Sequence, residues 1–145
     1  MLWLRKSKKG FTLIELMVVV AIIGVLALLG LRLYTGQQEK AKNAIVKANV
    51  GTIQTLIQAE LADSEVADVG DDVNTATTGL ISRSGIHNPF IGGPQIDNGT
   101  AGGAIGEVYV VVTDFDGDGT DDGFIINGNN ALNEDVYATP LEAHK

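Results

Sequence analysis

The chain begins with a basic leader, and an apolar run then extends from Phe11 to Leu31 with Glu15 as its one charged residue. As an α-helix these 21 residues would span about 30 Å, the thickness of a bilayer's hydrocarbon core. Beyond Gly36 the pattern becomes amphipathic. Seven apolar residues there fall within an arc of about 160° on a helical wheel: Ile45, Val46, Val50, Ile53, Leu56, Ile57 and Leu61. The pattern predicts one long helix from Phe11 to about Ala67.

From Gly70 onward the composition shifts to Gly, Asn, Asp and Thr, and the apolar runs become short. Strands are predicted at GLIS around Leu80, at EVYVVVT over 107–113 and at FIIN over 124–127. The middle run is apolar on both faces, so one side should pack on the helix and the other beneath a loop. The predicted fold is α+β: a long N-terminal helix, whose hydrophobic half protrudes, and whose amphipathic half packs against a small antiparallel sheet.

Charge and composition exclude several classes of function. The formal net charge is −8, and four of the ten basic residues precede Gly10. The remaining chain sets six Lys and Arg against eighteen Asp and Glu, so direct nucleic-acid binding by one subunit is not expected. The absence of cysteine excludes disulfides, a c-type haem and a Cys-ligated zinc site. Gly92-Gly93 lacks a phosphate-loop pattern, and no serine has a partnered base, so neither a nucleotide site nor an enzyme is predicted.

The basic leader and the apolar run permit three interpretations. A secretory signal peptide would have a shorter apolar region followed by a small-residue cleavage site, and neither is present. A simple N-terminal anchor fits the hydropathy, with Arg5 to Lys9 on the cytoplasmic side. Neither interpretation accounts for Glu15 or for the Gly10-Phe11 junction.

The third interpretation rests on the segment GFTLIE, residues 10–15, with Lys8-Lys9 before it and LMVVVAIIG after it. This segment closely resembles the N-terminus of type IV pilins, with a class III prepilin signal. The resemblance implies removal of a leader, residues 1–10, by prepilin peptidase between Gly10 and Phe11, and N-methylation of Phe11. Many family members have a proline where this chain has Arg32, so unwinding of the helix between Gly24 and Gly36 rests on glycines alone.

The resemblance further implies a division into leader (1–10), transmembrane or filament-core helix (11–36) and globular head (37–145). The chain would be the major structural subunit of an extracellular filament, a helical homopolymer in which Glu15 pairs with the N-terminal amine of a neighbouring subunit's Phe11. Its other partners would be prepilin peptidase, the pilus assembly machinery and, before assembly, the inner membrane. The precursor would lie in the inner membrane and the filament on the cell surface.

Two alternatives remain open at this point. A pseudopilin of a type II secretion system shares the same N-terminus and often carries a calcium site, but the C-terminal ATPLEAHK has no recognisable major-pseudopilin pattern. A monomeric, membrane-anchored binding module with a calcium-dependent face is a candidate from a different class. Long filaments built from this chain would select the pilin.

A second motif, TDFDGDGTDDGF over 113–124, matches the first nine places of an EF-hand-type calcium loop. Its predicted calcium ligands are Asp114, Asp116, Asp118, Asp122 and the backbone carbonyl of Thr120. Ile125 stands where a full EF-hand has its bidentate glutamate, so Asp121, Glu134 or Asp135 would have to complete the shell. Without a cation the same segment would be an acidic hairpin turn. Magnesium is less suitable, because it prefers fewer protein ligands and a tighter octahedron.

Overall fold

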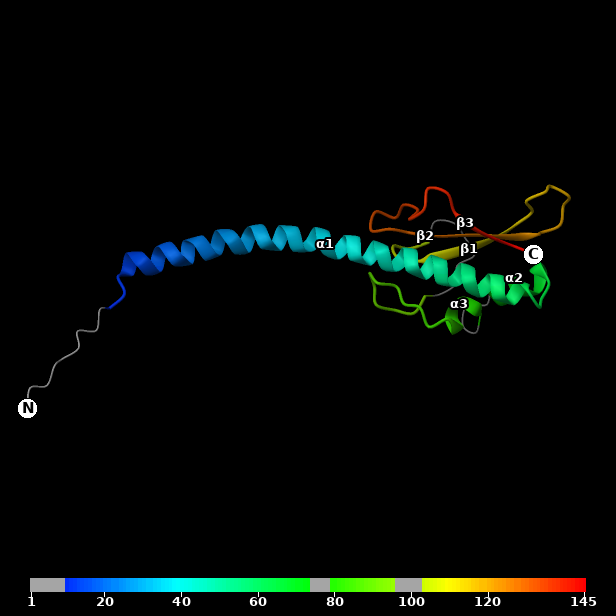
Figure 1. The fold of residues 1–145 in the computed structure, drawn as a ribbon, viewed down its shortest axis with the longest axis horizontal. Helices are drawn as coiled ribbons and strands as arrows, with labels where there is room; N and C mark the ends of the chain where they lie inside the picture. Colours follow the sequence, from blue (N-terminus) through cyan, green and yellow to red (C-terminus); the bar gives the residue numbers. More distant parts are fainter. Residues whose placement is uncertain (1–9, 74–78, 96–102) are drawn as a thin grey trace, which may run out of the picture. The chain divides into compact units, whose positions relative to one another are not determined.

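A computed structural model describes residues 10–73, 79–95 and 103–145 of the chain. Its elements, shown in Figure 1, are α1 (Leu13–Leu61), α2 (Val66–Val73), α3 (Leu80–Arg83), β1 (Val108–Thr113), β2 (Gly123–Gly128) and β3 (Leu141–His144). Two compact units are present, one ending at Gln38 and the other running from Glu39 to Lys145, and α1 belongs to both. The predicted α+β architecture, a long helix with a small antiparallel sheet, is confirmed.

The first part of α1 is helical without interruption through Gly24, Gly30 and Gly36. Every residue from Phe11 to Lys40 is exposed, including the large apolar side chains between Phe11 and Leu33. By length and composition, α1 is the one helix in the described part of the chain that could cross a membrane. The leader residues 1–9 lie outside the described residues.

The second part of α1 buries one face, formed by Val46, Val50, Ile53, Ile57 and Leu61. Their spacing of three or four residues places them on one side of the helix, as predicted. Ile45 lies at the margin of the predicted apolar arc and is 47% exposed.

The helix ends at Leu61, before the predicted end near Ala67, and the separate helix α2 follows. Val66, Val69 and Val73 of α2 are buried in the same core. At about 100° per residue, a straight continuation of α1 would turn these three valines roughly 140–200° away from Val46. The break after Leu61 therefore allows both apolar faces to join one core.

The sheet has the order β1-β2-β3, with both pairs antiparallel. β1 and β2 confirm two of the predicted strands. The strand predicted at GLIS is wrong, because Leu80 begins the short helix α3. Leu80 and Ile81 are both buried in the core cluster, whereas consecutive residues of a strand point to opposite faces. β3 was not predicted, since its four residues, LEAH, carry no strand-forming pattern.

Two contacts join the sheet to the second part of α1. At Gly128 of β2, a Cβ would lie only 2.8 Å from Cγ1 of Val46 and 3.0 Å from Cγ2 of Val50. At the β3 edge, the side-chain amides of Gln54 and Gln58 donate to the carbonyls of Glu142 and His144, each at 2.8 Å. The helix therefore covers a strand edge whose polar groups would otherwise be unpaired.

Buried amide side chains tie the loops of this cysteine-free domain to the sheet. The Gln95 side chain, 1% exposed, donates to the carbonyl of Gly106 at 2.7 Å and accepts from the N–H of Val108 at 3.1 Å. Asn88, also 1% exposed, accepts from the N–H of Phe90 at 2.9 Å and donates to the carbonyl of Ile105 at 2.8 Å. These hydrogen bonds fix the loop over 88–95 against the start of β1.

Candidate functional site

The N-terminal site is built on the first turn of α1, which begins just after Gly10, Phe11 and Thr12. The backbone N–H of Thr12 donates to Oε2 of Glu15 at 2.9 Å, and the Thr12 hydroxyl donates to the same oxygen at 2.7 Å. In return, the N–H of Glu15 lies 3.3 Å from the Thr12 hydroxyl oxygen. This reciprocal arrangement is a capping box, in which Thr12 is the N-cap and Glu15 the third helical residue.

The capping box fixes the direction of the carboxylate. Oε2 of Glu15 receives both hydrogen bonds from Thr12, while no group in the described part of the chain donates to Oε1. A carboxylate has room for several donors, so Oε1 remains available for a cation from outside the chain. An acidic residue in the first turn also interacts favourably with the helix dipole.

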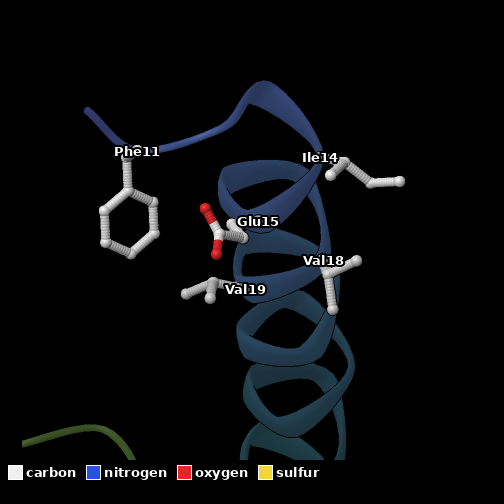
Figure 2. A pocket seen from close by; sticks show the side chains of 5 residues that line it. All are labelled: Phe11, Ile14, Glu15, Val18 and Val19. Carbon is white, nitrogen blue, oxygen red and sulfur yellow. The ribbon is translucent and has the colours of Figure 1, made fainter. Parts of the chain in front are cut away.

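The surroundings of Glu15 are apolar. Five residues line an open hollow of about 340 Å³: Phe11, Ile14, Glu15, Val18 and Val19. Figure 2 shows the Glu15 carboxylate beside the Phe11 ring in this view, with Val19 below it on the helix. A charge on such a surface needs a partner once lipid or protein covers it, because burying an unpaired carboxylate is costly.

The aspartate loop occupies the turn between β1 and β2. Asp114, Asp116 and Asp122 converge, with one carboxylate oxygen of each lying within 4.8 Å of the others. Asp118 is not part of this group, and its Oδ1 accepts from the N–H of Thr120 at 2.7 Å. The structure therefore brings three of the four predicted carboxylates together.

Backbone hydrogen bonds organise this loop around Asp114. Its two oxygens accept from the N–H groups of Gly117 at 2.7 Å and Gly119 at 2.9 Å. These two hydrogen bonds keep the pKa of Asp114 below its usual value, and the bond from Gly119 has the larger effect. Gly119, the sixth residue of the calcium-loop pattern counted from Asp114, has φ +92°, a left-handed conformation that glycine adopts readily.

The carboxylates considered for completing the calcium shell lie outside the convergent group of Asp114, Asp116 and Asp122. Asp135 accepts a hydrogen bond of 2.7 Å from the Tyr109 hydroxyl. Together with burial of the ring, this carboxylate raises the pKa of Tyr109 to about 12. Oε2 of Glu134 lies 3.4 Å from the side-chain nitrogen of Asn130. Both side chains thus have partners of their own.

Comparison with known families identifies the N-terminal segment. Residues 5–31 match the prokaryotic N-terminal methylation motif. This segment is similar to the N-terminus of type IV pilins. The match includes the Gly10-Phe11 junction, Thr12 and Glu15, and the long helix with a small antiparallel sheet is the α+β fold of pilins.

Similar curated proteins are fimbrial. Fimbrial protein Q of Moraxella bovis is 34% identical over 101 residues, covering 64% of each chain. Fimbrial protein EcpB of Eikenella corrodens is 44% identical over 63 residues, 43% of this chain and 40% of that protein. The type IV major fimbrial protein FimA of Dichelobacter nodosus is 40% identical over 65 residues, 45% of this chain and 41% of its own. The chain thus spans less than two thirds of the length of these relatives, and no solved structure matches it.

Sequence reasoning missed the part that Thr12 plays in this pilin segment. The pattern T-x-x-E before an apolar run is a capping-box pattern, and it is present at Thr12 to Glu15. The missed consequence is that Glu15 has an intrachain partner, which orients its carboxylate within the chain.

Proposed function

We propose that the mature chain, cut between Gly10 and Phe11 and N-methylated at Phe11, is the major structural subunit of an extracellular type IV pilus-like filament. One observation carries this proposal. Glu15 is the only charge in an exposed apolar helical surface, and one of its carboxylate oxygens is held by Thr12 while the other is uncommitted. In a monomer anchored in lipid, no other copy of the chain would supply a cation for the second carboxylate oxygen.

Cleavage supplies the complementary charge. It converts the Phe11 amide nitrogen into a positive amine, and methylation retains that charge. When apolar helices of several copies pack together, the amine of one subunit can pair with Oε1 of a neighbour's Glu15. Leaving either charge alone in such a core would cost several kcal/mol, about 3–5 kcal/mol in buried pairs. The pair therefore favours the one helix register in which both charges are matched, as a lone polar residue does in a coiled coil.

The same proposal includes the cellular location of the chain and its interaction partners. The basic residues Arg5 to Lys9 hold the precursor's leader on the cytoplasmic face of the inner membrane. Prepilin peptidase removes the leader, and the assembly machinery moves the apolar helix from lipid into the filament, which emerges at the cell surface. The role is structural rather than enzymatic, and its principal partner is another copy of the chain.

Calcium is the second part of the proposal. Asp114, Asp116 and Asp122 would bind the cation through carboxylate oxygens, with Asp118 and the Thr120 carbonyl joining them. Support comes from the calcium-loop spacing, from the convergence of three carboxylates and from the left-handed Gly119. A bound cation would offset the repulsion among these carboxylates and stabilise the β1–β2 hairpin.

Electron microscopy of material sheared from cells that produce the full chain tests the filament proposal. The expected result is long filaments in which mass spectrometry finds this chain as the main component. Short, secretion-dependent assemblies would instead indicate the pseudopilin. A chain that stays entirely in the membrane fraction, with no polymer, would indicate the anchored monomer.

A further inference from the structure

Charge is distributed unequally along the part of α1 that belongs to the head. Its first turns carry three lysines, Lys40, Lys42 and Lys47, with Glu39 as their one acidic neighbour, and residues 48–59 carry no charge. We call the three lysines the basic end. Residues 60–72 carry six carboxylates and no cation, and we call these the acidic end: Glu60, Asp63, Glu65, Asp68, Asp71 and Asp72.

At the basic end, one lysine lacks a partner. The Lys42 ammonium lies 5.2 Å from the centre of the Phe90 ring, and that of Lys47 lies 5.5 Å from the Tyr137 ring. Both distances suit cation–π contacts within the head. Lys40 is exposed, and its side chain contacts no charged or aromatic partner among residues 10–73, 79–95 and 103–145. It is therefore the lysine most available to another molecule.

At the acidic end, two carboxylates that make no ion pair in the described part of the chain line one hollow. Asp72 pairs with Arg83, and Glu65 pairs with Lys145 at 2.7 Å. Neither Glu60 nor Asp68 makes an ion pair in the described part of the chain. Both line an open hollow of about 230 Å³, together with Ser64, Val69, Asp72 and Arg83. The hollow thus carries a surplus of negative charge.

The two ends cannot satisfy each other within one molecule. Lys40 and Glu60 are separated by 20 residues of continuous helix, which corresponds to about 30 Å. No lysine side chain bridges such a distance. A carboxylate of the acidic end that pairs with Lys40 must therefore belong to a second molecule, and a copy displaced along the helix direction presents this complementary charge.

We propose that the head of one subunit docks its basic end on the acidic end of a second copy, with Lys40 entering the hollow between Glu60 and Asp68. This inference rests on the proposed filament, in which axially displaced copies of the head lie against one another. The contact is distinct from the Glu15 pair. That pair matches the apolar helices, whereas this one matches the heads and is open to screening by salt.

Charge reversal in the full chain tests the docking. Lys40→Glu, and separately Asp68→Lys, should lower the amount of sheared filament about fivefold, the change that corresponds to losing a contact of about 1 kcal/mol. Combining the two reversals restores an attractive pair and should return filament towards the wild-type amount. Glu134→Lys is the matched control for Asp68→Lys, because it makes the same charge change at an exposed position of the head outside both the basic end and the acidic end, and it should have less effect.

Cysteine cross-linking tests the same contact by geometry. The chain has no cysteine of its own, so Lys40→Cys with Asp68→Cys adds the only thiols. The long helix between these positions prevents an intrachain disulfide, which requires Cα atoms about 4.4–6.8 Å apart. Oxidised filaments of the double variant should give a ladder of linked chains, and either single variant should not.

The outcomes separate the two proposals. Abundant filaments from both charge-reversed variants, with no cross-linked ladder, would overturn the docking and leave the filament proposal intact. Absence of polymer from the wild-type chain would overturn both. Equal loss in the control and test variants would show that net charge, rather than the Lys40 contact, controls assembly, and would also overturn the docking.

Discussion

Thr12 and Glu15 hold each other at the start of α1 through two hydrogen bonds to a single carboxylate oxygen, at 2.9 and 2.7 Å. The capping box that begins the helix therefore also orients the carboxylate that is proposed to act in assembly. The same bonds that begin the helix all go to one carboxylate oxygen and leave the second without a donor in the described part of the chain. Because Thr12 follows Phe11 directly, the proposed cut before Phe11 would place the new amine within one turn of this carboxylate.

Replacing Thr12 tests whether this orientation matters. Thr12→Val keeps the shape of the side chain but removes the hydroxyl, so Glu15 loses one of its two donors and the helix loses its N-cap, worth about 1 kcal/mol. We expect less filament per cell at an unchanged level of processed subunit. Thr12→Ser retains the hydroxyl and should assemble normally. Equal filament yields from the valine and serine variants would show that the capping box has no part in assembly.

Glu15→Ala should block filament formation or reduce it strongly, while the head remains folded. The physical reason is that the amine of a neighbouring Phe11 loses its buried counter-charge. Filament yield and protease resistance of the membrane-bound subunit measure the two effects. Glu39→Ala also removes one carboxylate from α1, but beyond the apolar run, and serves as the control. Normal filaments from the Glu15 variant would contradict the proposed pairing.

The aspartate loop predicts calcium-dependent stability. Calcium at a hundred times its dissociation constant adds about 2.7 kcal/mol if the unfolded chain does not bind. For a head of this size, a gain of 1 kcal/mol raises the unfolding temperature by about 4 °C or more, so the expected rise is about 10 °C. Full-length chain in detergent is melted with calcium and with chelator. Asp116→Ala should remove the gain, Asp118→Ala should reduce it, and Asp63→Ala should retain it. Superimposed melting curves of the wild-type protein would mean that the loop is an acidic turn.

Replacing two glycines of the head by alanine should change its stability in opposite directions. Gly128→Ala places a methyl group 2.8 Å from Val46 and 3.1 Å from the backbone oxygen of Glu107, and overpacking of this kind costs about 1–3 kcal/mol. A Cβ added at Gly51, within α1, would meet no atom within 4 Å apart from its chain neighbours and the adjacent backbone of its own helix, so Gly51→Ala should add up to about 1 kcal/mol through helix propensity. Chemical denaturation of both variants measures the difference. A Gly128 variant as stable as wild type would contradict the close packing of helix and sheet.

The regular parts of the fold could be predicted from the sequence because they carry strong periodic signals. The buried face of α1 follows helical spacing, and β1 and β2 are runs of strand-forming residues. The elements that were missed depend on contacts that are distant in sequence. β3 exists because β2 pairs with it and because Gln54 and Gln58 cover its outer edge. The break after Leu61 is required only because the valines of α2 must face the same core.

The candidate sites also divide into residues that a local motif predicts and residues whose position depends on the fold. Gly10, Phe11 and Glu15 are recognised from a short contiguous motif, which needs no knowledge of the fold. The convergence of Asp114, Asp116 and Asp122 follows from their alternate spacing, but the separate position of Asp118 depends on the turn that its own side chain forms with the Thr120 N–H. The hollow at the acidic end is lined by residues from three helices, so it could not be predicted from any local sequence pattern.

Mass spectrometry of the N-terminal peptide from sheared filaments tests whether the amine that Glu15 is proposed to pair with exists. We expect a chain that begins at Phe11 with a methylated amine, free of the leader. A chain that retains Met1, or one cut beyond Gly24, would lack that amine and would contradict the proposed pairing.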